Sequence, residues 1–363
     1  MYVSNAVWEK PMQEIADAFL AEKDYGFDFT FTVSEVKDGG TTDDGVMMLR
    51  CSQFLDVSDL VFKGGLQEIT ITENDLDPRA TNRFVVDGKT YGIPLSSNNG
   101  CALFYDGSLF GEEDVATFDH LFAKAKEKGV KVGDYFEDQT QLLSFFSKHG
   151  AKTTQSHRVE GRELITSTTS SFASQNGLEA AKLVSQYCAY LPKVGDRLGA
   201  GFGGTWYYDY GAKQEFGENL KIAPIPKLRE GDAWITPPTS QEDIGIIIYN
   251  TADKPEAKQL LNDLANALAS EDAQRKYLEA IGPNYVPTNL AAREDYPLDI
   301  RPFIDNMESS IGVGHYQLAV YNEAEKLYRQ IKADNGACDE AVLTAALQNY
   351  DQQTTTESRS PLY

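Results

Sequence analysis

Two neighbouring segments hold the residues whose types and spacing suggest ligand chemistry. Gly199-Ala-Gly201-Phe-Gly203-Gly204 matches the spacing G-x-G-x-x-G, and Trp206-Tyr207-Tyr208-Asp209-Tyr210 follows directly. This glycine pattern binds a dinucleotide only between a strand and a helix, with an acidic residue about 20 positions further on. Pro224 stands at that place, and the sequence predicts neither element around the glycines. We therefore interpret the glycines as a flexible loop beside a close backbone approach.

The aromatic segment is the better candidate for a binding site. The chain contains 19 Tyr, 18 Phe and 3 Trp residues, and Trp206, Tyr207 and Tyr208 lie in polar, glycine-rich surroundings that are not typical of a core. Aromatic faces pack against the apolar C–H face of a sugar while polar side chains bind its hydroxyls, and small-molecule sites combine such apolar walls with a few polar groups. The alternative is a loop whose rings pack on the protein's own core.

The remaining patterns give no catalytic or metal-binding signature. The four histidines lack H-x-x-H spacing, and neither a G-x-S-x-G elbow nor a P-loop is present. The four cysteines, at positions 51, 101, 188 and 338, fit no metal or redox pattern, so we expect free thiols. We expect no cofactor and no metal. A glycosidase or esterase with an acidic cleft stays open, because 55 acidic residues make chance carboxylate pairs abundant.

Length and charge limit the possible partners. The 363 residues favour two domains, and the net charge is −22. A surface this acidic repels phosphate groups, which argues against nucleic-acid binding and against a basic membrane-surface role. No apolar run approaches the ~20 residues that span a bilayer. The same charge would suit a cationic ligand such as a polyamine, which aromatic walls also bind, so that ligand class stays open.

Hydrophobic periodicity predicts alternating strands and helices, as in an α/β protein with a mainly parallel sheet. Strands are predicted over residues 27–34, 46–49, 102–105, 220–226 and 244–249, with a hairpin over 84–91. Helices are predicted over residues 8–22, 52–62, 117–128, 139–148, 174–190, 254–268, 271–280, 300–309, 317–332 and 338–350. The polar run 96–100 is interpreted as a turn, or as a hinge if the chain forms two lobes, and the tail from Gln352 as frayed.

Several segments, in order, resemble a known family. Residues 86–94, 102–110 and 116–122 are similar to the run "GKxYGIP…LxYNKDLF…TWDEL" of bacterial extracellular solute-binding proteins, the sugar-capturing components of ABC importers. Further similarities lie at Gly204-Thr-Trp206, Ile222 to Pro226, Ala269 to Gln274 and Tyr285 to Asn289. The resemblance covers nearly the whole chain, and its order and spacing carry more weight than any one segment.

The resemblance implies a type II periplasmic-binding-protein-like α/β fold of two lobes joined by hinge crossings. The predicted N-terminal lobe comprises residues 1–98 and 244–298, and the predicted C-terminal lobe residues 99–243 and 299–363. The implied function is capture of an oligosaccharide, such as a malto-oligosaccharide, by hinge closure and its delivery to the membrane subunits of an ABC permease. The resemblance also implies that the protein is a monomer. It implies a location in the periplasm, or a lipid anchor that holds the protein outside the cytoplasmic membrane. A role in sensing instead of transport stays open.

The resemblance also implies ligand-binding residues. Trp206 takes the position of a sugar-stacking Trp, in the segment that also holds Tyr207 and Tyr208. The other implied contacts are Asn5, Trp8, Arg50, Gln53, Asn98, Asn99, Gln241, Glu242 and Tyr321. Leu49-Arg50 stands where maltose binders carry a Trp, and this departure concerns maltose itself more than sugar binding. Glu242 and Asp243 introduce two acidic residues near the expected hinge.

Overall fold

The computed structural model describes residues 1–363 except 4–5, 27–28, 36–46, 52–56, 99, 193, 251–254, 298–299, 308–309, 313–317, 333–336 and 363. Its longer helices are α1 (Glu9–Glu22), α4 (Phe118–Lys128), α5 (Gln139–Lys148), α6 (Gln175–Tyr190), α9 (Pro255–Leu268), α10 (Glu271–Ile281), α13 (Leu318–Ile331) and α14 (Glu340–Thr354). Short helices are η1 (Ala6–Trp8), α2 (Val57–Phe62), α3 (Pro78–Asn82), η3 (Tyr135–Glu137), η6 (Gly282–Asn284), α11 (Leu290–Arg293) and α12 (Pro302–Met307).

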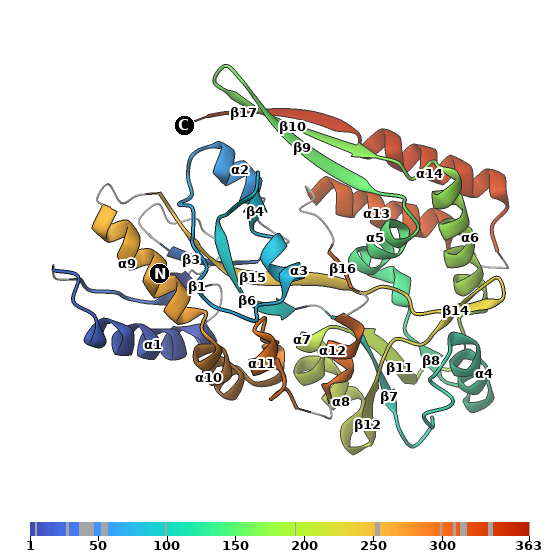
Figure 1. Ribbon diagram of the computed structural model, residues 1–363. Coiled ribbons are helices and arrows are strands. Elements are labelled where there is room, and N and C mark those ends of the chain that lie inside the picture. Colours follow the sequence, from blue (N-terminus) through green and yellow to red (C-terminus); the bar gives the residue numbers. More distant parts are fainter. Residues whose placement is uncertain are drawn as a thin grey trace.

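One sheet, called the large sheet here, is built from distant parts of the chain. Its strands are β1 (Tyr2–Val3), β2 (Ser34–Glu35), β3 (Met47–Cys51), β6 (Gly92–Asn98), β15 (Ser240–Ile248) and β16 (Ile311–Gly312). Parallel strands β2, β1 and β3 come first in the order, and β15 lies antiparallel between β3 and β6. The central position of β15 agrees with its apolar run, because a strand covered on both faces alternates little. In Figure 1, α1, α9 and α10 lie beside this sheet.

A second sheet, called the small sheet here, contains four strands. They are β12 (Leu220–Ala223), β7 (Ala102–Asp106), β11 (Leu198–Gly203) and β8 (Lys131–Val132), in that order. The largest buried cluster packs this sheet against α4, α5, α6, α13 and α14, and a second cluster packs the large sheet against α1, α9 and α10. The second cluster also contains Ala102 and Phe104 of β7, so it continues from the large sheet onto one face of the small sheet. Figure 1 shows the two sheets, each with helices beside it. The lobe boundaries given above stay a prediction.

Three small antiparallel units complete the fold. The hairpin of β4 (Val85–Val86) and β5 (Lys89–Thr90) was predicted, and its turn residues Asp87 and Gly88 have positive φ angles of 49° and 76°. A second hairpin pairs β13 (Leu228–Glu230) with β14 (Ala233–Ile235). A three-stranded sheet joins β9 (Thr153–Glu160), β10 (Glu163–Ser170) and β17 (Thr356–Pro361).

Three predictions about local structure are wrong. The tail forms β17 instead of fraying, because β10 supplies a pairing edge. Residues 96–98 continue β6, since β15 pairs with them and buries Ser96 and Ser97, so the turn is wrong, whereas the alternative of a hinge stays a prediction. Residues 27–28 of the predicted strand 27–34 lie outside the described residues. Among residues 29–34, only Ser34 pairs in a sheet, and residues 29–33 bury Phe31 and Val33 without strand pairing. The alternation of apolar and polar residues in this segment therefore indicates which side chains are buried, but it does not indicate pairing in a sheet.

Candidate functional site

The aromatic segment begins where β11 ends. Gly204 precedes α7 (Thr205–Tyr207), which continues into a π-helical turn, η4 (Tyr208–Ala212), and then into α8 (Lys213–Phe216) and η5 (Gly217–Asn219). The glycine-rich run before it is a strand, not the predicted loop, and no dinucleotide turn forms there. The expected close approach is present, since a Cβ on Gly199 would lie 2.6 Å from Cγ2 of Val130. A π-helical turn is rare and is frequent at functional sites.

Two glycines determine where the ring of Tyr207 lies. A Cβ on Gly203 would be 2.7 Å from Cβ of Tyr207, and a Cβ on Gly211 would be 2.0 Å from its Cε2. Contacts this short are not tolerated, so only glycine at both positions leaves room for the ring. The ring also stands edge-on to Phe104 of β7, with 5.2 Å between centroids. Tyr207 therefore fixes α7 against the small sheet.

Trp206 lies between two inward-facing neighbours and projects outward. Thr205 is 3% exposed and Tyr207 is partly buried, whereas Trp206 is 54% exposed. An exposed Trp on a short helix that its neighbours hold in place is a preorganised apolar platform, and such platforms lose little conformational freedom when a ligand covers them. The sequence-based interpretation that the surroundings of Trp206 are not typical of a core agrees with this exposure.

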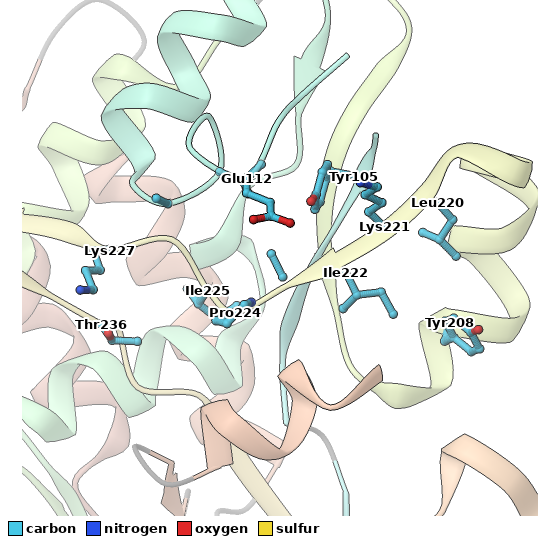
Figure 2. A pocket seen from close by; sticks show the side chains of 13 residues that line it. Tyr105, Glu112, Tyr208, Leu220, Lys221, Ile222, Pro224, Ile225, Lys227 and Thr236 are labelled. Carbon is cyan, nitrogen blue, oxygen red and sulfur yellow. The ribbon is translucent and has the colours of Figure 1, made fainter. Parts of the chain in front are cut away.

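Tyr208 connects the aromatic segment to a pocket of about 650 Å³ beside β12. Figure 2 shows Glu112 and Tyr105 directed toward the same space, with Tyr208 at the other end beside Leu220 and Ile222. Nζ of Lys213 lies 4.2 Å from the centroid of the Tyr208 ring. Among the predicted ligand-binding residues, Tyr208 lines this pocket and Trp206 does not.

Gln241 belongs to a buried polar network on β15, which pairs with β6. It is 5% exposed, and its Nε2 donates to Oδ1 of Asp243 at 2.8 Å and to Oγ of Ser97 at 3.2 Å. Ser97 donates in turn to Oδ1 of Asp243 at 2.7 Å, and Ser310 donates to Oε1 of Gln241 at 2.5 Å. The side chain of Gln241, which the sequence predicts as a ligand contact, thus makes its hydrogen bonds to other residues of the protein.

The carboxylate of Asp243 carries an electrostatic cost. Burial raises its pKa, and hydrogen bonds from Ser97 and Gln241 oppose that shift without cancelling it. Its counter-charge is Arg83, whose Nε lies 3.8 Å from Oδ2 of Asp243. A buried carboxylate is retained where it has a structural or functional role, because an apolar replacement would cost less.

Trp8 and Tyr321 lie in different surroundings from Trp206. Trp8 is 5% exposed and packs edge-on against Tyr277 and Tyr285, with 5.3 Å between centroids in each pair. Trp8 is a core residue in this structure, and we do not propose it as a ligand contact. Tyr321 is partly buried against the core of the small sheet. The same aromatic type thus serves as core at Trp8 and as surface at Trp206.

The other predicted contacts are placed only in part. Asn98 and Glu242 are Cα partners across β6 and β15, and Arg50 is paired with Gly245 across β3 and β15. The backbones of these three residues are described, but their side chains are not. Asn5, Gln53 and Asn99 lie outside the described residues.

Sequence reasoning missed the residues that support the site. Gly211 and Phe104, which hold Tyr207, and Ser310, which binds Gln241, carried no signal of their own. The polar pair Ser96 and Ser97 inside an apolar strand was visible, but its buried partner Asp243 lies 146 residues away.

Three features of the part of the chain that the structure describes concern metal binding, membrane crossing and thiol chemistry. Within it, no group of three His, Cys, Asp or Glu side chains could hold a metal ion. No helix among these residues is both long and apolar enough to cross a bilayer. Cys101 and Cys188 are buried free thiols, and burial raises their pKa values, so they are not activated nucleophiles.

Strand order and lobe architecture together define the class of protein. A sheet in which a late strand, β15, lies between β3 and β6, next to a second α/β layer, is the type II periplasmic-binding-protein fold. The maltodextrin-binding protein of L. casei BL23, solved without ligand, matches with a TM-score of 0.76 at 14% identity, covering 98% of each chain. A cyclo/maltodextrin-binding protein complexed with maltotetraose matches with a TM-score of 0.72 at 17% identity, covering 98% of this chain and 96% of that one.

The maltose-binding protein of Listeria monocytogenes, in complex with maltose, matches with a TM-score of 0.70 at 16% identity, covering 97% of this chain and 96% of that one. The family profile described as bacterial extracellular solute-binding protein matches residues 52–299, more than half of the chain. The protein belongs to the bacterial extracellular solute-binding protein family. No curated protein matches it by sequence.

Proposed function

We propose that this protein captures a neutral oligosaccharide and delivers it to the membrane subunits of an ABC permease. The observation that carries the proposal is Trp206, which is 54% exposed on a helix fixed by the partly buried Tyr207. Apolar sugar faces cover such a ring and leave the sugar hydroxyls to polar neighbours. Membership of the solute-binding family and structural neighbours solved with maltose and maltotetraose support this ligand class.

The proposed mechanism is closure of two lobes about the segments that connect them. β6 leads from the large sheet into β7 of the small sheet, and β15 returns the chain to the large sheet. A ligand that contacts both lobes binds the closed arrangement better and shifts the equilibrium toward it. Bond making is not part of the proposed role. Incubation with oligosaccharides that leaves them intact separates this role from that of a glycosidase.

The proposed location is outside the cytoplasmic membrane, in the periplasm or tethered by a lipid, with the protein as a monomer. Family membership supports the extracellular setting. Sedimentation of the purified protein tests the monomer, and fractionation of the producing cells tests the location.

A thermal-shift screen tests the ligand class. A ligand that binds only the native state stabilises it by about 2.7 kcal/mol at a 100-fold excess over Kd. We expect neutral malto-oligosaccharides, or oligosaccharides of related shape, to raise the melting temperature. Stabilisation by spermidine or putrescine alone would contradict the proposal and favour the cationic ligand that a net charge of −22 would also attract.

Small-angle scattering tests closure. With a stabilising sugar, the radius of gyration should fall, because the lobes approach each other. An unchanged radius with a sugar that calorimetry shows to be bound would contradict hinge closure.

A further inference from the structure

Three segments pass between the surroundings of the two sheets, and their side chains meet at one buried point. The first runs from Ser97 of β6 into β7, and the second enters β15 at Ser240. The third follows α12, whose Asn306 donates to the carbonyl of Cys101 at 2.9 Å, and reaches β16 through Ser310. Strand β16 then pairs with Ser240 and Gln241 of β15.

The start of β15 is held from the side of the small sheet. Ser240 Oγ accepts hydrogen bonds from Nε2 of Gln141 at 2.9 Å and from Oγ1 of Thr140 at 3.0 Å, both on α5. The backbone N–H of Ser240 donates to Oε1 of Gln141 at 3.0 Å. Gln141 is 4% exposed, so these bonds are shielded from water.

Three residues later, the same strand is held from the side of the large sheet. Asp243 is fully buried and accepts a hydrogen bond from Ser97 of β6 at 2.7 Å. Arg83, which follows α3, brings its Nε to 3.8 Å from the second carboxylate oxygen. The backbone from Ser240 to Asp243 therefore lies between an anchor on α5 and an anchor on β6.

The third segment is tied to that same interval. Gln241 lies between the two anchors, donates to Asp243 and Ser97, and accepts from Ser310. Ser310 also contacts the carbonyl of Met307, which accepts a hydrogen bond from Arg79 as well. A single network, called the pivot network here, thus joins all three connecting segments; it consists of the buried Ser97, Gln241 and Asp243 and the partly buried Ser310.

We propose that Asp243 is a positioning residue that sets the angle between the two lobes through the pivot network. Asp243 is the common acceptor for Ser97 and Gln241, and a relative rotation of the lobes has to rearrange bonds that it organises. The proposal rests on the proposed closure, because a change in the resting angle then alters ligand affinity without contact to the ligand. Apparent affinity scales with the population of the binding-competent arrangement.

The test measures the angle without any ligand. Spin-labelled unnatural amino acids replace Lys10 of α1 and Val342 of α14, whose exposed fractions are 86% and 49%, so the four native cysteines stay untouched. Pulsed electron resonance then gives the interlobe distance distribution of the parent and of Asp243→Asn. The matched control is Asp263→Asn on α9, which removes a carboxylate that accepts from Tyr25 at 3.0 Å in the same half of the molecule.

We expect Asp243→Asn to shift or broaden the distance distribution and to change sugar affinity by about threefold or more, with Asp263→Asn like the parent. A folded Asp243→Asn protein with the parent distribution overturns the proposal. If Asp243→Asn does not fold, Ser310→Ala, which removes one donor to Gln241, decides by the same criterion. A shifted distribution in a protein that binds no sugar supports the pivot network and contradicts the proposed function instead.

Discussion

The ring of Tyr207 stands edge-on to Phe104, with 5.2 Å between centroids and a 77° angle between ring planes. This pair joins α7 to the centre of the small sheet, because Phe104 lies on β7 and is fully buried. Trp206, the residue before Tyr207, is therefore directed outward by packing at its neighbour. The exposure of the proposed platform is a property of the fold, not of a mobile loop.

Gly211→Ala should damage both stability and binding. The added methyl would lie 2.0 Å from Cε2 of Tyr207, so the ring must move and α7 must shift with it. Overpacking of this kind costs about 1–3 kcal/mol. Urea unfolding measures the loss, and calorimetry should show weaker sugar binding. Gly111→Ala is the matched control, since its nearest atom, Oδ2 of Asp114, would be 3.5 Å away; equal effects of the two variants would contradict the role of Tyr207.

Trp8→Ala should destabilise the protein without a specific effect on binding. The indole is 5% exposed and packs on Tyr277 and Tyr285, and removal of a buried aromatic side chain costs about 3–5 kcal/mol. Denaturant unfolding checks the size of the loss. At a temperature where the variant is fully folded, its Kd should equal that of the parent. A variant of unchanged stability with weakened sugar binding would contradict this role and would show that Trp8 contacts the sugar.

Asp77→Asn should lower stability in a pH-dependent way. Burial raises the pKa of Asp77, but hydrogen bonds from Arg79 and the charge of Arg293, whose Nη1 lies 3.1 Å away, outweigh it and leave the pKa below its usual range. A carboxyl group with a lowered native pKa stabilises the fold fully above its unfolded value of about 3.9, and this contribution is lost as pH falls through the native pKa.

The free energy of unfolding in urea, measured for the parent and Asp77→Asn from neutral to acidic pH, checks this sign. Their difference should be constant near pH 7 and should shrink as the solution becomes acidic. A difference that grows on acidification would mean that Asp77 is held in its protonated form.

Local signals predicted much of the fold. Helices α4 and α6 lie within one residue of their predicted ranges, 117–128 and 174–190; α4 begins at the Thr117 cap and ends at Gly129, whose φ is 67°. The strands of the sheet β9–β10–β17 escaped prediction because β9 and β17 consist mostly of polar residues and show no apolar alternation. Pairing with β10 also comes from the far end of the chain, which no local pattern reports.

The candidate site divides in the same way. Trp206 could be proposed from its glycine-rich surroundings and from the family resemblance, since both are local in sequence. The bond between Ser97 and Asp243 joins residues 146 positions apart, and a polar pair of that separation leaves no periodic trace. The sequence therefore predicts Gln241 as a ligand contact, whereas in the structure its side chain forms hydrogen bonds within the pivot network.

Calorimetric titration of Trp206→Ala with the most stabilising sugar tests the central claim most directly. Loss of an aromatic anchor costs about 2 kcal/mol or more, or roughly 30-fold in Kd. The melting temperature without sugar should be nearly unchanged, because the ring is 54% exposed. Trp234→Ala, at a Trp of β14 that is 45% exposed, is the control and should bind like the parent. Unchanged affinity in Trp206→Ala, or an equal loss in both variants, would contradict Trp206 as the sugar platform.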